Sequence, residues 1–150
     1  MRIAVSSDTD EPVARQLVDE LRRRGHTVVP FGALGAGDDR ADWAWSAGAA
    51  ARAVAEGGAD HAVVCCWTGT GASIAANKVP GVRAALCADA PTADGARRWN
   101  DANALALSLR TLSGPVLQEI LDAWFAGAPS QDQEDRDNVA HLRALEGGPS

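Results

Sequence analysis

The sequence lacks three features that define common functional classes: a basic patch, a long apolar run and a zinc-binding spacing of cysteine and histidine. Its net charge is -6, from 14 Lys and Arg against 20 Asp and Glu, and no basic stripe occurs. Nucleic acid is therefore not an expected partner, because phosphate backbones are bound by clustered Lys and Arg. No apolar run approaches a membrane span and the N-terminus has no signal-peptide pattern, so we expect a cytoplasmic protein without a membrane partner.

Metal chemistry is not indicated either. The three histidines are scattered, and none is spaced with a cysteine as a zinc site requires. In the cytoplasm we expect the three cysteines to be free thiols, namely Cys65, Cys66 and Cys87. The sequence therefore predicts neither a metal site nor a disulfide.

Length and composition fit one globular domain. The chain has 150 residues, of which 46% are hydrophobic and 23% charged, which is enough for a substantial core. We assign residues 1–130 to a single α/β domain and residues 131–150 to a polar C-terminal helix and tail.

Strand-like and helix-like segments alternate along the chain, which is typical of a parallel sheet covered on both faces. The segment His61–Cys66 is continuously apolar, as in a strand buried on both faces. The expected strands are Arg2–Ser7, His26–Gly32, His61–Cys66, Val82–Cys87 and Ala104–Leu109. The expected helices begin near Pro12, Trp43, Ala72, Pro91, Gly114 and Asp135. This order predicts a doubly wound five-stranded parallel sheet in a Rossmann-like three-layer α/β sandwich.

Such sheets bind ligands beyond the carboxyl ends of their strands. Three informative stretches follow strands: SSDTD after the first, CWTGTG after the third and CADAPT after the fourth. In the second stretch, Gly69 and Gly71 allow backbone N–H groups to turn inward, and the positive end of the following helix points to the same place. This arrangement suits a phosphate, a carboxylate or an oxyanion.

A thiol comes directly before this turn. At the strand end, Cys66 is a candidate nucleophile or general base. Packing is the alternative, because cysteine is among the most buried residue types and adjacent strand residues face opposite ways. On the residues alone we interpret Cys65 as packing, and leave Cys66 open between packing and catalysis.

The stretch GTGASIAANKVPGVRAALCADAPTADGARRWNDANALALSLR resembles the ribose-5-phosphate isomerase B / galactose-6-phosphate isomerase family. That family's pattern is Cys-Gly-Thr-Gly-x-Gly, then Ser-Ile-Ala-Ala-Asn-Lys, Gly-x-Arg-Ala and His-Asn-Asp-x-Asn-x-Leu. The match is specific from Cys66 to Arg110, looser before Gly32 and poor after Ala126. The resemblance implies a doubly wound domain that isomerises a small aldose and ketose without metal or organic cofactor. It also implies a homodimer or a tetramer of dimers, with each site shared between two subunits.

The resemblance assigns roles to individual residues. Cys66 matches the family's general base, which moves a proton between C1 and C2 of the open-chain sugar, and Thr68 matches the threonine of the same motif as a second catalytic candidate. Some relatives use a glutamate at the position of Ala72, so this chain belongs with the cysteine users. The amides of the glycine turn would stabilise the enediolate oxygen. The expected substrate contacts are Asp8, Thr9, Trp67, Gly69, Thr70, Gly71, Ala72, Ser73, Trp99, Asn100 and Arg110.

The chain departs from the family around the expected pocket. Thr9 stands where the family has a histidine, and Trp67 stands where it has a glycine. Trp99 replaces the family histidine that opens the sugar ring. Trp43 and Trp45 fall in a segment expected near the pocket. We interpret these tryptophans as pocket lining, with core packing as the alternative.

The tail departs as well. The arginines that clamp phosphate in the family have no counterpart, because Glu134, Asp137 and Asn138 occupy their best register and Arg136 is the one nearby cation. Carboxylates at such positions repel a phosphate dianion. We therefore expect an aldose–ketose isomerase whose substrate is altered, with an unphosphorylated sugar as one option. The alternatives are an ordinary sugar-phosphate isomerase, or a non-catalytic subunit or binding protein of the same fold.

Overall fold

The computed structural model describes residues 1–36 and 40–147. These residues contain one five-stranded parallel sheet with the strand order β2-β1-β3-β5-β4. The strands are β1 (Arg2–Ser7), β2 (Thr27–Gly32), β3 (His61–Cys66), β4 (Ala84–Leu86) and β5 (Ala104–Ser108). The predicted fold class is confirmed.

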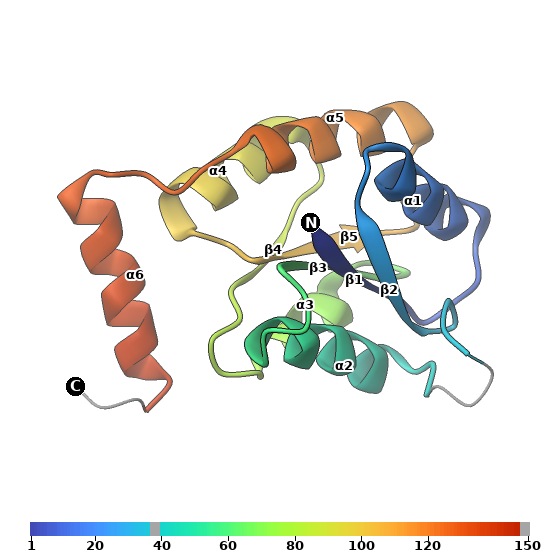
Figure 1. The fold of residues 1–150 in the computed structure, drawn as a ribbon, viewed down its shortest axis with the longest axis horizontal. Helices are drawn as coiled ribbons and strands as arrows, with labels where there is room; N and C mark the ends of the chain where they lie inside the picture. The colour runs from blue at the N-terminus through green and yellow to red at the C-terminus, as the bar shows by residue number, and fades with distance from the viewer. Residues whose placement is uncertain (37–39, 148–150) are drawn as a thin grey trace.

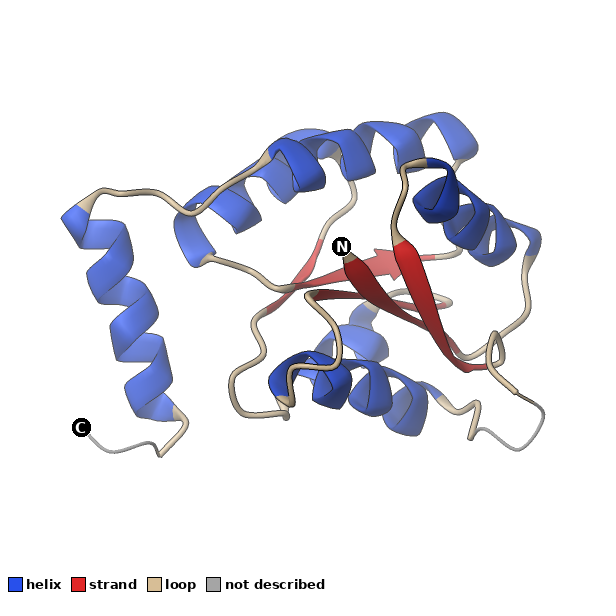
Figure 2. Cartoon of the chain, in the orientation of Figure 1, coloured by secondary structure: helices blue, strands red, loops and turns tan. Residues whose placement is uncertain are grey.

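Helices cover both faces of the sheet (Figure 1). One face carries α1 (Pro12–Arg23), α4 (Ala90–Asn100) and α5 (Gly114–Ala126). The other face carries α2 (Trp43–Ala55) and α3 (Thr70–Asn77), which gives the three layers seen in Figure 2. The last helix, α6 (Gln133–Leu145), stands beside the sandwich and contacts α4.

The two faces of the sheet are packed by side chains of different size. Alternation along β3 directs Val63 and Cys65 toward α1, α4 and α5, where Trp124 is fully buried. Cys66 faces α2 and α3, where the core consists mostly of alanine. Because these side chains are small, Cys66 shares its core with Ala72 in the first turn of α3.

Two boundaries differ from the expectation. The helix α3 begins at Thr70 rather than near Ala72, because Gly69 has a φ of 76° and turns the chain directly into the helix. The strand β4 is shorter than expected, because the N–H of Val82 donates to the carbonyl of Val79 in a turn, at 3.1 Å, instead of pairing with β5.

The helix α6 begins two residues earlier than expected, and none of its residues is buried. Near its end, the Glu146 carboxylate accepts a hydrogen bond from the Gly81 backbone at 3.0 Å. The boundary at residue 130 stays a prediction. Within the described parts of the chain, no helix has both the length and the apolar character needed to cross a bilayer.

Candidate active site

The sheet has a switch point between β1 and β3. The chain leaves β1 toward β2 on one side and leaves β3 toward β5 and β4 on the other, so the two connections diverge. Crevices at such points hold the ligands of open α/β sheets. The register pairs Ser7 with Cys65, so the next residues, Asp8 and Cys66, are neighbours at this edge.

The three cysteines are free and buried, but only one faces the turn. Cys66 is 4% exposed and lies under α3. Burial raises the pKa of Cys65 well above its ordinary range, and burial raises the pKa of Cys87 to about 11. Cys65 and Cys87 therefore stay protonated at neutral pH, as expected of packing residues.

We expect iodoacetamide at about pH 8 to alkylate Cys66 before Cys65 or Cys87 in the folded protein, because the thiolate is the reactive form. The raised pKa values of Cys65 and Cys87 keep them as thiols at that pH. Peptide mass mapping over a time course measures the order. Earlier labelling of either of the other two thiols would contradict this assignment.

The turn after β3 depends on Gly69. Its φ of 76° lies in the left-handed region, and a Cβ there would lie 2.5 Å from Leu86 Cδ1 and 2.9 Å from the carbonyl carbon of Leu107. Gly71 is also closely covered, because a Cβ would lie 2.8 Å from the ring of Trp43. The two glycines therefore let the turn lie against β5 and under an indole ring.

The first turn of α3 presents backbone amides to this edge of the sheet. Its N-cap is Gly69, which supplies no side-chain acceptor, and the first helical N–H to bond within the helix is that of Ser73, to Gly69 at 3.0 Å. The hydroxyls of Thr68 and Thr70 hydrogen-bond each other at 2.8 Å. Free amides at the positive end of a helix suit an oxyanion.

Asp8 brings a carboxyl group to the same edge. Its Oδ1 is buried and has no hydrogen-bond partner among the described residues. Burial raises the pKa of Asp8, and a hydrogen bond from its own backbone amide offsets part of this effect. Next to it, the N–H of Thr9 donates to the Ser7 hydroxyl at 3.3 Å, which orders the loop after β1.

Arg110 reaches this edge from the end of β5. Its backbone N–H donates to the carbonyl of Trp67 at 2.9 Å, and the Ser108 hydroxyl donates to the same carbonyl at 3.0 Å. The turn after β3 is thus tied to the end of β5. The structure therefore brings together the predicted residues from the ends of β1, β3 and β5: Asp8, Thr9, Cys66, Trp67, Thr68, Gly69, Thr70, Gly71, Ala72, Ser73 and Arg110.

Four of the five tryptophans are exposed, namely Trp43, Trp45, Trp67 and Trp99, and Trp124 belongs to the core. Trp43 covers the glycine turn and Trp67 lies within it. Trp45 instead stacks under Arg40, at 4.6 Å from the guanidinium to the ring centroid. Trp43 and Trp67 are therefore the two that border this edge.

Trp99 and Asn100 lie at the opposite edge of the sheet. The helix α4 begins after the carboxyl end of β4 and ends before the amino end of β5. Trp99 folds back over Gly95, where a Cβ would lie 2.6 Å from its ring. Within one chain, these two predicted contacts are therefore separated from Cys66 by the length of the sheet.

Other residues of the WNDAN motif have structural roles. Asp101 pairs with Arg83 at 3.2 Å and with Arg97 at 3.6 Å. The side chain of Asn103 accepts from the Arg83 backbone at 2.7 Å and donates to Gly81 at 3.0 Å. Asn77, interpreted as structural, bonds both backbone groups of Ala84, at 2.8 and 2.9 Å. Much of the motif therefore stabilises the connections around β4.

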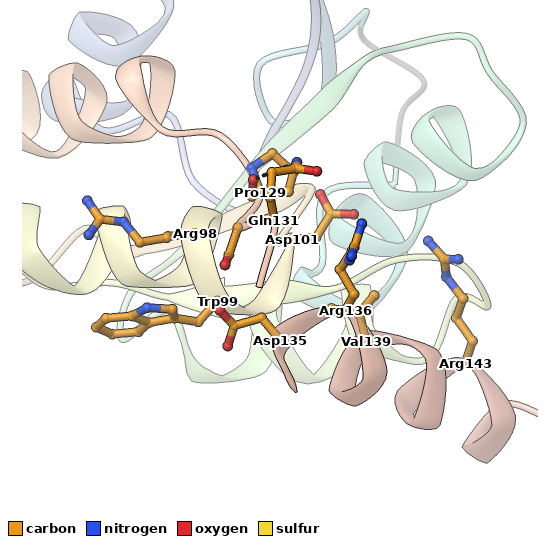
Figure 3. Close-up of a pocket in the computed structure, with 10 residues that line it drawn as sticks. Arg98, Trp99, Asp101, Pro129, Gln131, Asp135, Arg136, Val139 and Arg143 are labelled. Atoms are coloured by element: carbon orange, nitrogen blue, oxygen red, sulfur yellow. Dashed lines mark hydrogen bonds between the residues drawn. The ribbon is translucent and has the colours of Figure 1, made fainter. Parts of the chain in front are cut away.

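A hollow of about 260 Å³ opens between the end of α4, the α5–α6 connection and α6 (Figure 3). Trp99 lines it, and Cys66 does not. The charged side chains on its wall are three arginines and two aspartates: Arg98, Arg136, Arg143, Asp101 and Asp135. This hollow is thus distinct from the strand-end site of the same chain.

The charge of this hollow differs from the sequence-based expectation. The stretch from Asp132 to Asp137 contains four carboxylates, and it predicted a surface that repels anions. The helix α6 directs Arg136 and Arg143, which are seven residues apart on one face, toward the hollow, and only Asp135 of the four carboxylates lines it. Helical phase, rather than composition, decides which charges face the hollow.

A metal centre is not indicated. Within residues 1–36 and 40–147, no cluster of three or more His, Cys, Asp or Glu side chains is arranged to hold a metal ion. His61 is remote from the site, because it lies at the amino end of β3 and accepts a hydrogen bond from the Trp124 indole at 3.1 Å.

Comparison with known proteins gives consistent matches. The family model described as Ribose/Galactose Isomerase matches residues 3–142. The chain is 35% identical to ribose-5-phosphate isomerase B of Escherichia coli over 87% of its length and 86% of the relative. It is 33% identical to galactose-6-phosphate isomerase subunit LacB of Clostridium acetobutylicum over 97% of its length and 83% of the relative. The solved structure of ribose-5-phosphate isomerase B from Clostridium thermocellum superposes with a TM-score of 0.88 at 36% identity, covering 100% of both chains.

Proposed function

Because the chain belongs to the ribose/galactose isomerase family, we propose that it interconverts an aldose and a ketose by proton transfer through an enediolate. Cys66 is the base of this proposal. The observation that carries it is the position of Cys66 at the switch-point strand end, directly before the uncapped first turn of α3. We place this chemistry in the cytoplasm, where free thiols persist.

The proposed steps follow from the geometry of the turn. The Cys66 thiolate removes the proton from C2 of the open-chain aldose, and the electron pair moves into the C1–C2 bond while negative charge develops on the carbonyl oxygen. Amides of Thr70 and Gly71 stabilise that charge. A proton then passes from O2 to O1, and the Cys66 thiol returns its proton to C1, so the ketose forms, the base is regenerated and no cofactor is consumed.

We also propose that each site is shared between two copies of the chain. Trp99 and Asn100 are too far from Cys66 in one chain to contact a common small substrate. The α6 helix has no buried residue, and the exposed Trp67 and Ile74 border the turn and α3. A second copy in a homodimer, or in a tetramer of dimers, supplies the missing half of the site.

A mixing experiment tests the shared site. Cys66→Ala and Asn100→Ala are each expected to be weakly active alone. After co-refolding in equal amounts, about a quarter of wild-type activity should return, because half of the dimers are mixed and each mixed dimer has one intact site. Absence of recovery, with mixed dimers demonstrated by mass, would contradict a shared site.

The substrate is proposed to differ from that of the ribose-5-phosphate enzymes at the end remote from C1. This proposal rests on Glu134, Asp137 and Asn138, which stand where the resemblance places phosphate-binding arginines. The second candidate is an ordinary sugar-phosphate isomerase. It is favoured by Arg98, Arg136 and Arg143 around the hollow, because guanidinium groups bind phosphate bidentately.

Turnover of D-ribose 5-phosphate and of free pentoses and hexoses under one condition separates the two candidates. We expect kcat/KM for the phosphate ester to be no higher than for the best free sugar, because the phosphate-clamping arginines that the resemblance implies have no counterpart at their register. Efficient turnover of the ester with inert free sugars would restore the ordinary function. Absence of turnover with every sugar would favour a non-catalytic subunit or binding protein of the same fold.

A further inference from the structure

We propose that Asp8 is a second catalytic residue, which transfers the hydroxyl proton between the two oxygens of the enediol while Cys66 transfers the carbon proton. The inference rests on the proposed isomerase function. It starts from the proton balance of that reaction and from the side chains available at the switch point.

An aldose–ketose isomerisation moves two protons. One leaves C2 and arrives at C1, and a second leaves the hydroxyl O2 and arrives at O1. After C2 has lost its proton, the O1 oxyanion must receive a proton, because O1 is a hydroxyl in the ketose. When C1 is protonated, O2 must lose its proton to become the ketone. One thiol engaged with the carbons does not serve both oxygens, so a second acid–base group is needed.

Few titratable side chains lie at this edge in the described part of the chain. Arg110 carries a guanidinium, which donates hydrogen bonds and accepts none. Asp10 is engaged by Arg15, and Asp89 accepts a hydrogen bond from the Thr92 amide, and these interactions lower the pKa of each aspartate. Such carboxylates are poor proton donors, because their charged form is stabilised.

Asp8 has the opposite environment. It follows β1 beside the end of β3, adjacent to Cys65 and Cys66, and its buried Oδ1 has no partner among the described residues. Burial raises the pKa of Asp8, which favours the protonated carboxyl needed to supply a proton to O1. The free oxygen gives it an unused hydrogen-bonding position next to the proposed base.

Within one chain, the histidines do not compete for this role. His26 stacks on Phe125 with 4.3 Å between ring centroids, and His61 contacts Trp124 at the amino end of β3. His141 lies on α6. Thr9, the residue after Asp8, carries no titratable group.

Stability gives a readout that separates catalysis from structure. Because the pKa of Asp8 is raised in the folded protein, the folded state binds more protons than the unfolded state, and the stability contributed by Asp8 falls as the pH rises above the unfolded value. At pH 7 the neutral Asp8→Asn side chain removes this cost. The Tm of the variant should therefore equal or exceed that of the wild type.

The test compares Asp8→Asn with the matched loop variant Asp10→Asn, using whichever of D-ribose and D-ribose 5-phosphate the wild type turns over faster. We expect Asp8→Asn to lose about 10²-fold to 10³-fold in kcat with KM changed by less than about threefold. We expect Asp10→Asn to stay within about twofold of the wild type, because its ion pair is exposed.

Three outcomes would overturn the assignment. Unchanged kcat in Asp8→Asn excludes a proton-transfer role, a rise in KM alone indicates substrate holding, and a joint fall in kcat and Tm indicates a structural role. Cys66→Ala distinguishes this failure from failure of the proposed function. If Cys66→Ala is inactive and Asp8→Asn is not, only the inference about Asp8 fails, and if the wild type turns over no sugar, the proposed function fails.

Discussion

Replacing Cys66 with alanine is expected to lower kcat on the best substrate by about 10³-fold, the middle of the range for loss of a general base. The alanine side chain has no proton acceptor, and no other thiol replaces it. Cys65 and Cys87 belong to the core under α1, α4 and α5, on the face of the sheet opposite Cys66. The residual rate would come from the amides of α3 and from substrate orientation.

Cys65→Ala is the matched control for this variant. It removes a neighbouring thiol of equal size from the other face of β3, so kcat should change by less than about twofold while stability falls by roughly 1 kcal/mol. Steady-state kinetics and thermal unfolding of both variants measure the contrast. Wild-type turnover by Cys66→Ala would show that another group is the base.

Gly69→Ala is expected to cost about 3 kcal/mol of unfolding free energy and at least about 10²-fold in kcat. The left-handed conformation disfavours any Cβ, and the added Cβ would also lie 2.5 Å from Leu86 Cδ1 and 3.0 Å from the carbonyl oxygen of Leu107. The Leu86 side chain can rotate away, but the Leu107 backbone is part of strand β5 and is held in the sheet. The turn must therefore move, and the amides of α3 move with it.

Gly57→Ala separates the free-energy cost of the left-handed backbone conformation from the cost of the steric overlap. Gly57 has a similar φ of 79°, but a Cβ there would have no neighbour within 4 Å. It should lose only about 1 kcal/mol, with unchanged kcat, because it pays the conformational cost without the overlap. Denaturant unfolding of both variants gives the difference. Equal losses in the two would mean that the close approach to β5 has no energetic consequence.

The sequence by itself determined the layered architecture. Alternating apolar strands and amphipathic helices are local patterns, and the apolar run His61–Cys66 is typical of a strand covered on both faces. The turn after this strand was also predicted from the sequence, because Gly69 and Gly71 allow backbone conformations that other residues avoid. The family motif also predicted that the thiol and the turn lie side by side, because both belong to one short stretch of sequence.

Only the tertiary structure decided which of these features meet. Strand order placed Asp8 beside Cys66, although 58 positions separate them in the chain. The direction of α4 carried Trp99 and Asn100 to the edge of the sheet opposite Cys66 of the same chain. The phase of α6 directed Arg136 and Arg143 toward the hollow. Residue spacing along the chain does not show which of these residues lie close together in space. Their proximity is set by the crossover connections and by the rotation of each helix about its axis.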